Sequence, residues 1–184
     1  ASRGLTIEDN SAAEEFLLHN NYYRISGYSL TLRKNDKFYP SATMQNIMDI
    51  YNLDHALRHL LLEYIELIEV KMKSIYAYEI AKAHGPLSHQ NPNLFSNITK
   101  HSEILAKAEQ QSALLRRFMH SMTIIRNLCA HGSRLYNRIF QQKPWLSKAE
   151  LSLLRKSANG TPDNAHLYGF LFIMKRMLST SDFN

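Results

Sequence analysis

Apolar residues recur at three- and four-residue steps along most of this chain, which is the spacing of helices that bury one face. The longest such pattern begins after Thr43, a residue suited to cap a helix, and ends at the strong terminator formed by residues 84–86. Shorter helices are predicted from Ser11, over 98–111, over about 112–131 with a candidate continuation over 133–141, from Ser147 to about 156, and from Asp163 or Asn164 onward.

The N-terminal part departs from this period. Residues 22–28 break the helical spacing, and the polar stretch over 33–40 is typical of a turn or a small hairpin. Strand-like alternation is short wherever it occurs, and Gly and Pro are scarce. We therefore predict an all-α fold, an antiparallel bundle of four or five helices over residues 43–184 preceded by a small elaboration over residues 1–42.

Composition fits a globular domain that can bury a core without disulfides, since 45% of the 184 residues are apolar and 21% are charged. Cys129 is the single cysteine, which excludes an intramolecular disulfide and a Cys-rich zinc site. The sequence has no apolar run of about 18 residues, so no membrane span is expected. The N-terminal residues lack the pattern of a secretory signal, and we expect a cytoplasmic protein.

Positive charge is concentrated in one block. Residues 112–156 hold nine Lys and Arg against one Glu, and six of the nine are arginines, whose guanidinium groups bind phosphate in a forked geometry. Such a block usually indicates a polyanionic partner, most often nucleic acid. The alternative is a solvated basic face that has no partner.

The segment over 125–138 lies inside this block and contains the only Arg-x4-His of the chain, Arg126 and His131. Asn127, His131, Arg134 and Arg138 follow one another at helical steps, so they share a face if the helix persists past Gly132. Arg126 lies about 140° from His131 on an ideal helix, so the two converge only across a groove or at a local irregularity.

These residue types suit cleavage of RNA without a metal or cofactor, by attack of a ribose 2′-OH on its own phosphate. An imidazole transfers protons near neutral pH, which predicts that role for His131. A guanidinium stabilises the charge that develops on phosphate, which predicts that role for Arg126, while Asn127 orients one of these groups. One His and one Arg offer few groups for the two proton transfers that the reaction requires. Two copies of the chain are therefore expected to meet in a homodimer.

Further residues are candidates for contact with RNA: Arg116, Arg117, Arg134, Asn137 and Arg138 in the basic block, and Tyr23 and Arg24 near the N-terminus. The aromatic residues over 22–28 can stack on bases, but the interpretation that we favour is a plug that closes one end of the bundle.

Other chemistries fit the sequence less well. His55, His59 and Glu63 share a helical face at which a divalent metal is conceivable, but no established zinc pattern accompanies them, and we predict a solvated surface. Cys129 has no visible neighbourhood that would stabilise a thiolate, so a buried cysteine is the better interpretation. Gly-rich phosphate loops and nucleophile elbows are absent from the sequence.

The motifs together resemble a known family. Residues 126–138, RNLCAHGSRLYNR, are similar to the RNxCAH-x-x-RLxNR signature of the bacterial Abi proteins of the AbiD/AbiF type, which belong to the HEPN superfamily. Residues 22–28, YYRISGY, the segments over 50–58 and 65–69, and the loop at 83–87 also resemble segments of that family in the same order.

This resemblance implies a HEPN-like helical bundle, usually dimeric, in which Arg126 and His131 form a ribonuclease pair and Asn127 is the polar residue that follows the arginine. It also implies a role in phage defence, or a toxin-like activity that a partner inhibits. A binding module that docks a structured RNA or a protein and does not cut is the alternative. The chain departs from the family in being short around residues 110–114, which indicates an abbreviated segment or a missing loop.

Overall fold

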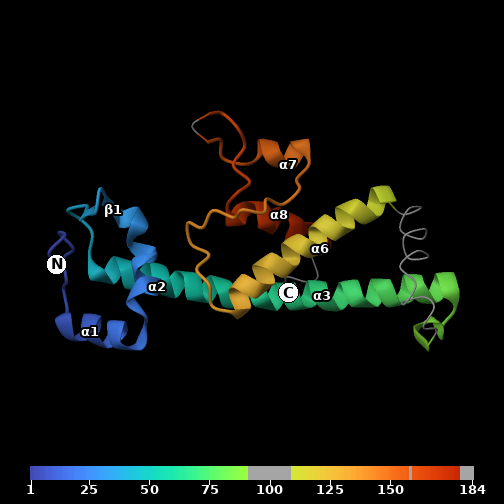
Figure 1. The fold of residues 1–184 in the computed structure, drawn as a ribbon, viewed down its shortest axis with the longest axis horizontal. Helices are drawn as coiled ribbons and strands as arrows, with labels where there is room; N and C mark the ends of the chain where they lie inside the picture. Colours follow the sequence, from blue (N-terminus) through green and yellow to red (C-terminus); the bar gives the residue numbers. More distant parts are fainter. Residues whose placement is uncertain (91–108, 158, 179–184) are drawn as a thin grey trace. The chain divides into compact units, whose positions relative to one another are not determined.

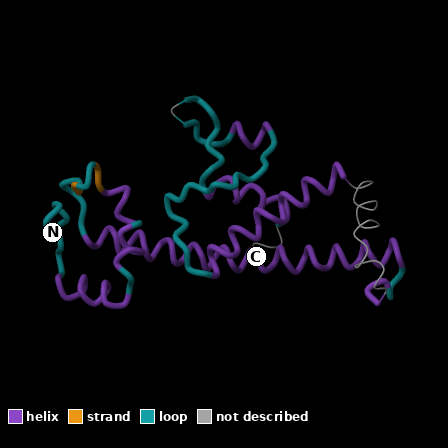
Figure 2. Tube along the Cα trace, viewed as in Figure 1, coloured by secondary structure: helices purple, strands orange, loops and turns teal. Residues whose placement is uncertain are grey.

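The computed structural model describes residues 1–90, 109–157 and 159–178, and the side chains of residues 89 and 109–116 lie outside this description. Helix dominates the described part (Figure 2), as predicted. The elements in chain order (Figure 1) are α1 Asn10–His19, α2 Tyr22–Ser26, the 3₁₀ helix η1 Tyr28–Leu32, β1 Arg33–Lys34, β2 Lys37–Phe38, α3 Met44–His84, the 3₁₀ helix η2 Ser88–Gln90, α6 Glu109–Ala130, α7 Lys148–Ser152 and α8 Leu167–Met177.

The chain forms two compact units. The first comprises residues 1–62 and 127–139, and the second comprises residues 63–126 and 140–184. Helices α3 and α6 each contribute residues to both units. The division into an elaboration over 1–42 and a bundle over 43–184 therefore stays a prediction.

The core of the first unit forms where the N-terminal elements pack on the start of α3. Its buried residues are Ala13, Ile25, Tyr28, Met44 and Ile47. The ring of Tyr51 contacts the rings of Phe16 and Tyr28 edge to face, at centroid distances of 5.2 and 5.4 Å. Edge-to-face pairs of this kind add to the stabilisation that apolar burial supplies.

The predicted small hairpin is confirmed in this unit. β1 and β2 pair antiparallel, with Arg33 opposite Phe38 and Lys34 opposite Lys37. The two residues between the strands, Asn35 and Asp36, have φ of 49° and 63°. Asn and Asp tolerate this left-handed conformation better than other residues with a side chain, and it is the conformation that a two-residue hairpin turn requires.

The ends of α3 agree with the prediction. The Thr43 hydroxyl accepts the N–H of Asn46, and the Asn46 side chain accepts the N–H of Thr43, which caps the start of the helix. At the other end Gly85 has φ of 90°, and its N–H donates to the carbonyl of Ala81. A glycine followed by a proline ends the helix there.

The second unit buries apolar residues from its portions of α3 and α6 and from α8. Ile65, Ile68 and Met72 come from α3, Phe118, Met122 and Ile125 from α6, and Phe170, Ile173 and Met174 from α8. The Phe140 and Phe170 rings are 4.6 Å apart. At α7, Ser147 and Glu150 form the predicted cap, and the Arg176 guanidinium holds the Glu150 pKa down at about 2.

Several predicted boundaries were wrong. Asp9 caps α1, because its carboxylate accepts the N–H of Ala12, so Ser11 lies inside the helix. α7 ends at Ser152, short of 156, and α8 begins after His166, beyond the predicted start. Residues 98–108 lie outside the described part, and α6 continues through the predicted boundary at 111–112.

Candidate functional site

Three separated segments of the first unit meet at the carboxylate of Asp54. The Tyr28 hydroxyl donates to Oδ2 at 2.7 Å, and the Arg58 guanidinium donates to the same oxygen. The backbone N–H groups of Leu135 and Tyr136 donate to Oδ1 at 2.9 and 2.6 Å. One carboxylate on α3 thus fixes the segment before the hairpin and the segment after α6.

The helix explains why Asp54 and Arg58 form a pair. They are four residues apart on α3, so they lie on one face, and both are buried, at 1% and 3% exposed. A buried ion pair is tolerated when its remaining hydrogen-bonding capacity is used, and the Tyr28 hydroxyl and two backbone donors use it here. This network therefore holds residues 135–136 in a fixed place.

The network predicts a loss of stability in alkali. Burial is the main cause, and the hydrogen bond to Asp54 the second, of a rise in the pKa of Tyr28 to about 12 from an ordinary value of 10.0. The folded state keeps this proton to higher pH than the unfolded state. The stabilisation is therefore complete below about pH 10 and is lost as pH rises toward 12. Urea unfolding across this range should show the decline.

Two variants check the assignment. Tyr28→Phe removes the titrating hydroxyl and should flatten the decline in stability between pH 10 and 12. Tyr23→Phe is the matched control, because Tyr23 is 83% exposed. If the two variants keep the same pH dependence as the parent chain, the hydroxyl of Tyr28 does not contribute in this way.

α6 ends at Ala130, close to the predicted end near residue 131, in a turn at Gly132. Gly132 has φ of 62°, its N–H donates to the carbonyl of Cys129, and the N–H of Ser133 donates to the carbonyl of Leu128. This pair of bonds is the Schellman motif, in which a residue in the left-handed conformation closes the helix. The helix therefore stops at Ala130, and the candidate continuation over 133–141 is wrong.

The shared face was predicted only if the helix persists past Gly132, and the turn shows that it does not. Asn127 lies in the last turn of α6, His131 follows the helix, and Arg134 and Arg138 lie in the non-helical segment beyond Gly132. Their spacing along the sequence therefore does not place these four residues on one helical face. Leu135, in this non-helical segment, is buried, at 1% exposed.

Arg24 of α2 lies against this turn. One of its terminal nitrogens donates to the carbonyl of Gly132, and its guanidinium lies 5.7 Å from the centre of the Tyr51 ring. His131, which precedes Gly132, is exposed. The first unit thus places an arginine and an accessible imidazole at one turn.

Gly132→Ala is expected to destabilise the chain more than the same change at Gly85. Both glycines end a helix and have positive φ, so in each variant an alanine must adopt the left-handed conformation, which costs about 1–2 kcal/mol. A Cβ at residue 132 would also lie 3.0 Å from the Arg24 guanidinium, whereas no atom of the described residues lies within 4 Å of a Cβ at residue 85. Chemical denaturation should give about 1 kcal/mol more loss for Gly132→Ala. Equal losses would argue against the Arg24 contact.

Arg126 is the first of the other predicted site residues, and it belongs to the second unit. It lies on α6 with its Nε 3.9 Å from Oε1 of Glu69, and its side chain is half exposed. His131 belongs to the first unit. The convergence of Arg126 and His131 on one phosphate therefore stays a prediction.

The remaining candidates differ in how the fold uses them. Arg134 donates to the carbonyl of Tyr136 at 2.7 Å, and Arg138 donates to the carbonyl of Arg134 at 3.4 Å, so both stabilise the loop. Asn137 is exposed and has φ of 48°. Arg117 is exposed on α6, while the side chain of Arg116 lies outside the described residues. Contact of these residues with RNA stays a prediction.

Within the aromatic segment over 22–28, one tyrosine fits the plug interpretation and two fit base stacking. Tyr28 is fully buried in the core of the first unit, as the plug interpretation predicts. Tyr22 and Tyr23 are exposed, and their rings contact each other edge to face. The exposed pair leaves ring surface accessible for stacking.

Cys129 is buried, and burial raises its thiol pKa to about 11. The thiol therefore stays protonated at neutral pH, which agrees with the prediction that it is not a nucleophile. Within the described residues, no group of three His, Cys, Asp or Glu side chains is placed to hold a metal, although the His55 and His59 rings contact each other. No described helix is long and apolar enough to cross a membrane.

Sequence reasoning missed the role of Asp54. The signal that could have found it is an Asp and an Arg four residues apart on a helix with otherwise apolar inward positions, because such a pair on a buried face demands partners. The sequence does not reveal which partners these are, since they come from residues 28 and 135–136.

Comparison with known proteins identifies a family. The sequence model of the family described as Abi-like protein matches residues 15–113 and, in a second overlapping stretch, residues 97–137. The matched ranges contain Arg24, Asp54, Arg58 and the turn at the end of α6. No curated protein and no solved structure matches this chain.

Proposed function

Since this chain belongs to the Abi-like protein family, we propose that it acts in bacterial abortive infection as a metal-independent endoribonuclease. The observation that carries the proposal is the exposed His131 at a turn that a buried carboxylate and Arg24 hold in place. A side chain that moves protons needs both access to substrate and a fixed position. We further propose that the fold is of the HEPN type.

The proposed reaction is an internal transfer at one phosphate. The ribose 2′-OH loses its proton and its oxygen bonds to phosphorus, while the bond from phosphorus to the 5′ oxygen breaks and that oxygen gains a proton. His131 serves in proton transfer, and Arg126 stabilises the charge on the phosphate oxygens. Asn127 orients one of the two. The products are a 2′,3′-cyclic phosphate and a free 5′-OH.

Substrate binding is assigned to the basic block and to the N-terminal residues near the turn. The RNA backbone would be contacted by residues of the basic block, namely Arg116, Arg117, Arg134, Asn137 and Arg138. On α2, Tyr23 and Arg24 would also contact RNA. We propose that two copies of the chain form the active dimer and that an inhibitory partner holds the activity in check.

Product chemistry tests this proposal against its alternative, a module that binds structured RNA or a partner without cutting. The intact chain is incubated with a defined single-stranded RNA in the presence of EDTA, and the new ends are identified by mass spectrometry. A cyclic phosphate and a 5′-OH support the nuclease. Full-length RNA after incubation with a homogeneous, folded preparation contradicts it and favours the binding module.

Mixing two inactive variants distinguishes an active site shared between two chains from an active site formed within one chain. An inactive His131→Ala chain and an inactive Arg126→Ala chain are refolded together. Recovered cleavage in the mixture indicates that one active centre draws on two copies. No recovery, with mixed dimers verified by differential tagging, contradicts a shared site.

A further inference from the structure

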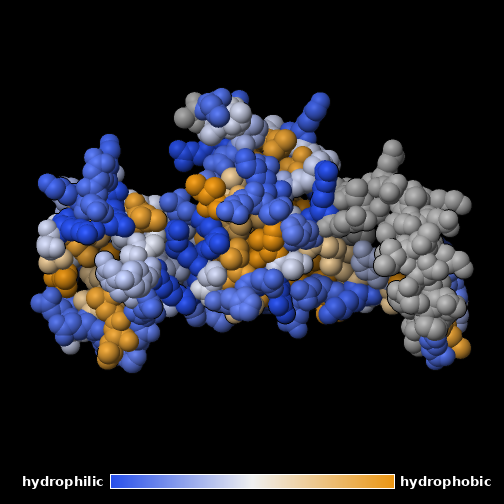
Figure 3. Space-filling model, viewed as in Figure 1, coloured by the Kyte–Doolittle hydropathy of each residue, from blue (hydrophilic) through white to orange (hydrophobic). Residues whose placement is uncertain are grey.

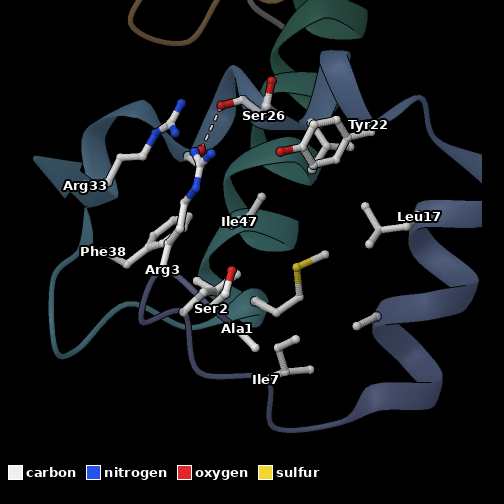
Figure 4. A pocket seen from close by; sticks show the side chains of 15 residues that line it. Ala1, Ser2, Arg3, Ile7, Leu17, Tyr22, Ser26, Arg33, Phe38 and Ile47 are labelled. Atoms are coloured by element: carbon white, nitrogen blue, oxygen red, sulfur yellow. Dashed lines mark hydrogen bonds between the residues drawn. The ribbon is translucent and has the colours of Figure 1, made fainter. Parts of the chain in front are cut away.

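A cavity of about 400 Å³ lies in the first unit (Figure 4), and Gly132 is not among its lining residues. It is lined by the N-terminal residues 1–7, α1, α2, η1, the hairpin and the start of α3; it is partly open, and its floor is apolar. The floor residues are Ala13, Ile25, Met44 and Ile47, all buried. The volume lies in the range of about 300–1,000 Å³ that is typical of small-molecule sites.

The wall of this cavity carries positive charge on one side. Arg3 and Arg33 both line it, and Figure 4 shows them on the side opposite Leu17 and Tyr22. Both guanidinium groups contact the same oxygen, Oδ1 of Asp36, at 3.2 and 3.0 Å. Two cations thus converge on one carboxylate oxygen and leave a net positive charge there.

The cavity offers this charge to a ligand. Among the described residues that line it there is no Asp or Glu, and Asp36 itself is an exposed residue of the hairpin turn. A carboxylate from outside could therefore share or replace the contacts that Asp36 makes. Guanidinium groups bind carboxylates well because their donors match the spacing of the two oxygens.

The opposite side is apolar and opens to solvent. Leu17 is 40% exposed and Tyr22 is 64% exposed. Figure 3 shows hydrophobic side chains at the surface in the region of α1, where the exposed Leu18 follows Leu17. A ligand that reaches from the two arginines across the floor would bury aliphatic surface along this path.

We propose that this cavity binds an amphiphilic carboxylate with a single aliphatic chain. The head group lies between Arg3 and Arg33, and the chain covers Ile25, Met44 and Ile47. The proposal is independent of the ribonuclease assignment, since neither His131 nor Arg126 lines the cavity. It assigns a small-molecule site to the N-terminal elements.

Binding of decanoate to the full chain tests the proposal, measured by titration calorimetry below the concentration at which decanoate forms micelles. Saturable binding at one site per chain is expected. Decanol, which has the same chain length without the charge, should bind at least about tenfold more weakly, since charge-assisted hydrogen bonds to two guanidinium groups are lost. Equal affinity for the two compounds, or no saturable binding of decanoate, overturns the proposal.

Variants locate the site. The double variant Arg3→Gln, Arg33→Gln should weaken decanoate binding about tenfold and leave decanol binding unchanged. Ala13→Leu fills the floor of the cavity and should weaken both compounds. Arg155→Gln is the control, an exposed arginine of the second unit that should change neither. Unchanged decanoate affinity in the double arginine variant, with its fold verified by circular dichroism, would place binding elsewhere.

Discussion

Asp54→Ala is expected to lower the free energy of unfolding by about 3–5 kcal/mol, which is the usual cost of removing one partner of a buried ion pair. The variant leaves the Arg58 guanidinium buried without its carboxylate. It also leaves the N–H groups of Leu135 and Tyr136 without their acceptor. Because a domain of this kind has about 5–15 kcal/mol in total, the loss would take a large share of its stability. Urea unfolding followed by circular dichroism measures it.

Asp49→Ala is the matched control for this experiment. Asp49 lies on the same helix but is exposed, and its carboxylate accepts a hydrogen bond from the side chain of Gln45. Its replacement should cost well under 1 kcal/mol, as is usual for surface positions. A double variant, Asp54→Leu with Arg58→Met, removes both charges and should recover part of the loss. If Asp54→Ala were as stable as Asp49→Ala, the network would not anchor the loop.

His131→Ala is expected to lower the rate of RNA cleavage about 100-fold or more while leaving the fold intact. The magnitude follows from the usual contribution of a positioned group that transfers protons, about 10²–10⁴-fold. The side chain is exposed at the end of α6, so its removal leaves no buried group without a partner. Single-turnover cleavage of a labelled RNA measures the rate apart from substrate binding.

His120→Ala is the control for this variant, because His120 is also exposed and lies on α6, the helix that ends immediately before His131. It should cleave at the rate of the parent chain. RNA affinity, measured by fluorescence anisotropy, should change little in either variant. Cleavage by His131→Ala at the parental rate would exclude the imidazole from the reaction, even if the chain proves to be a nuclease.

The sequence predicted the elements whose signals are local. Thr43 capped the long helix and the Gly85–Pro86 pair ended it, because both features depend on residues within one turn of the helix. The hairpin at residues 33–38 was similarly foreseeable from its polar Asn–Asp turn. Segments such as α8 were misplaced because several polar residues before it could each have served as a cap.

The candidate site was predictable only in part. The sequence predicted the end of the helix near residue 131 but left a continuation beyond Gly132 open, because the residues there repeat at three- and four-residue steps. A glycine in the left-handed conformation ends the helix there. The position of the loop after it depends on Asp54, which lies some 80 residues earlier. Hydrogen bonds over such a separation produce no periodic pattern in a sequence. The sequence pattern therefore identified the candidate residues but did not predict their positions in the fold.

The bonds from Asp54 to residues 135 and 136 go to main-chain nitrogens, and this has a consequence for how relatives of the chain can diverge. Every amino acid except proline supplies that donor. These two bonds therefore do not depend on the side chain at residue 136, whose ring packs against the core of the first unit and whose hydroxyl lies 3.1 Å from that of Thr31. Substitution at this position would change those side-chain contacts while the main-chain anchor to Asp54 persists, so the anchor and the contacts around it can evolve separately.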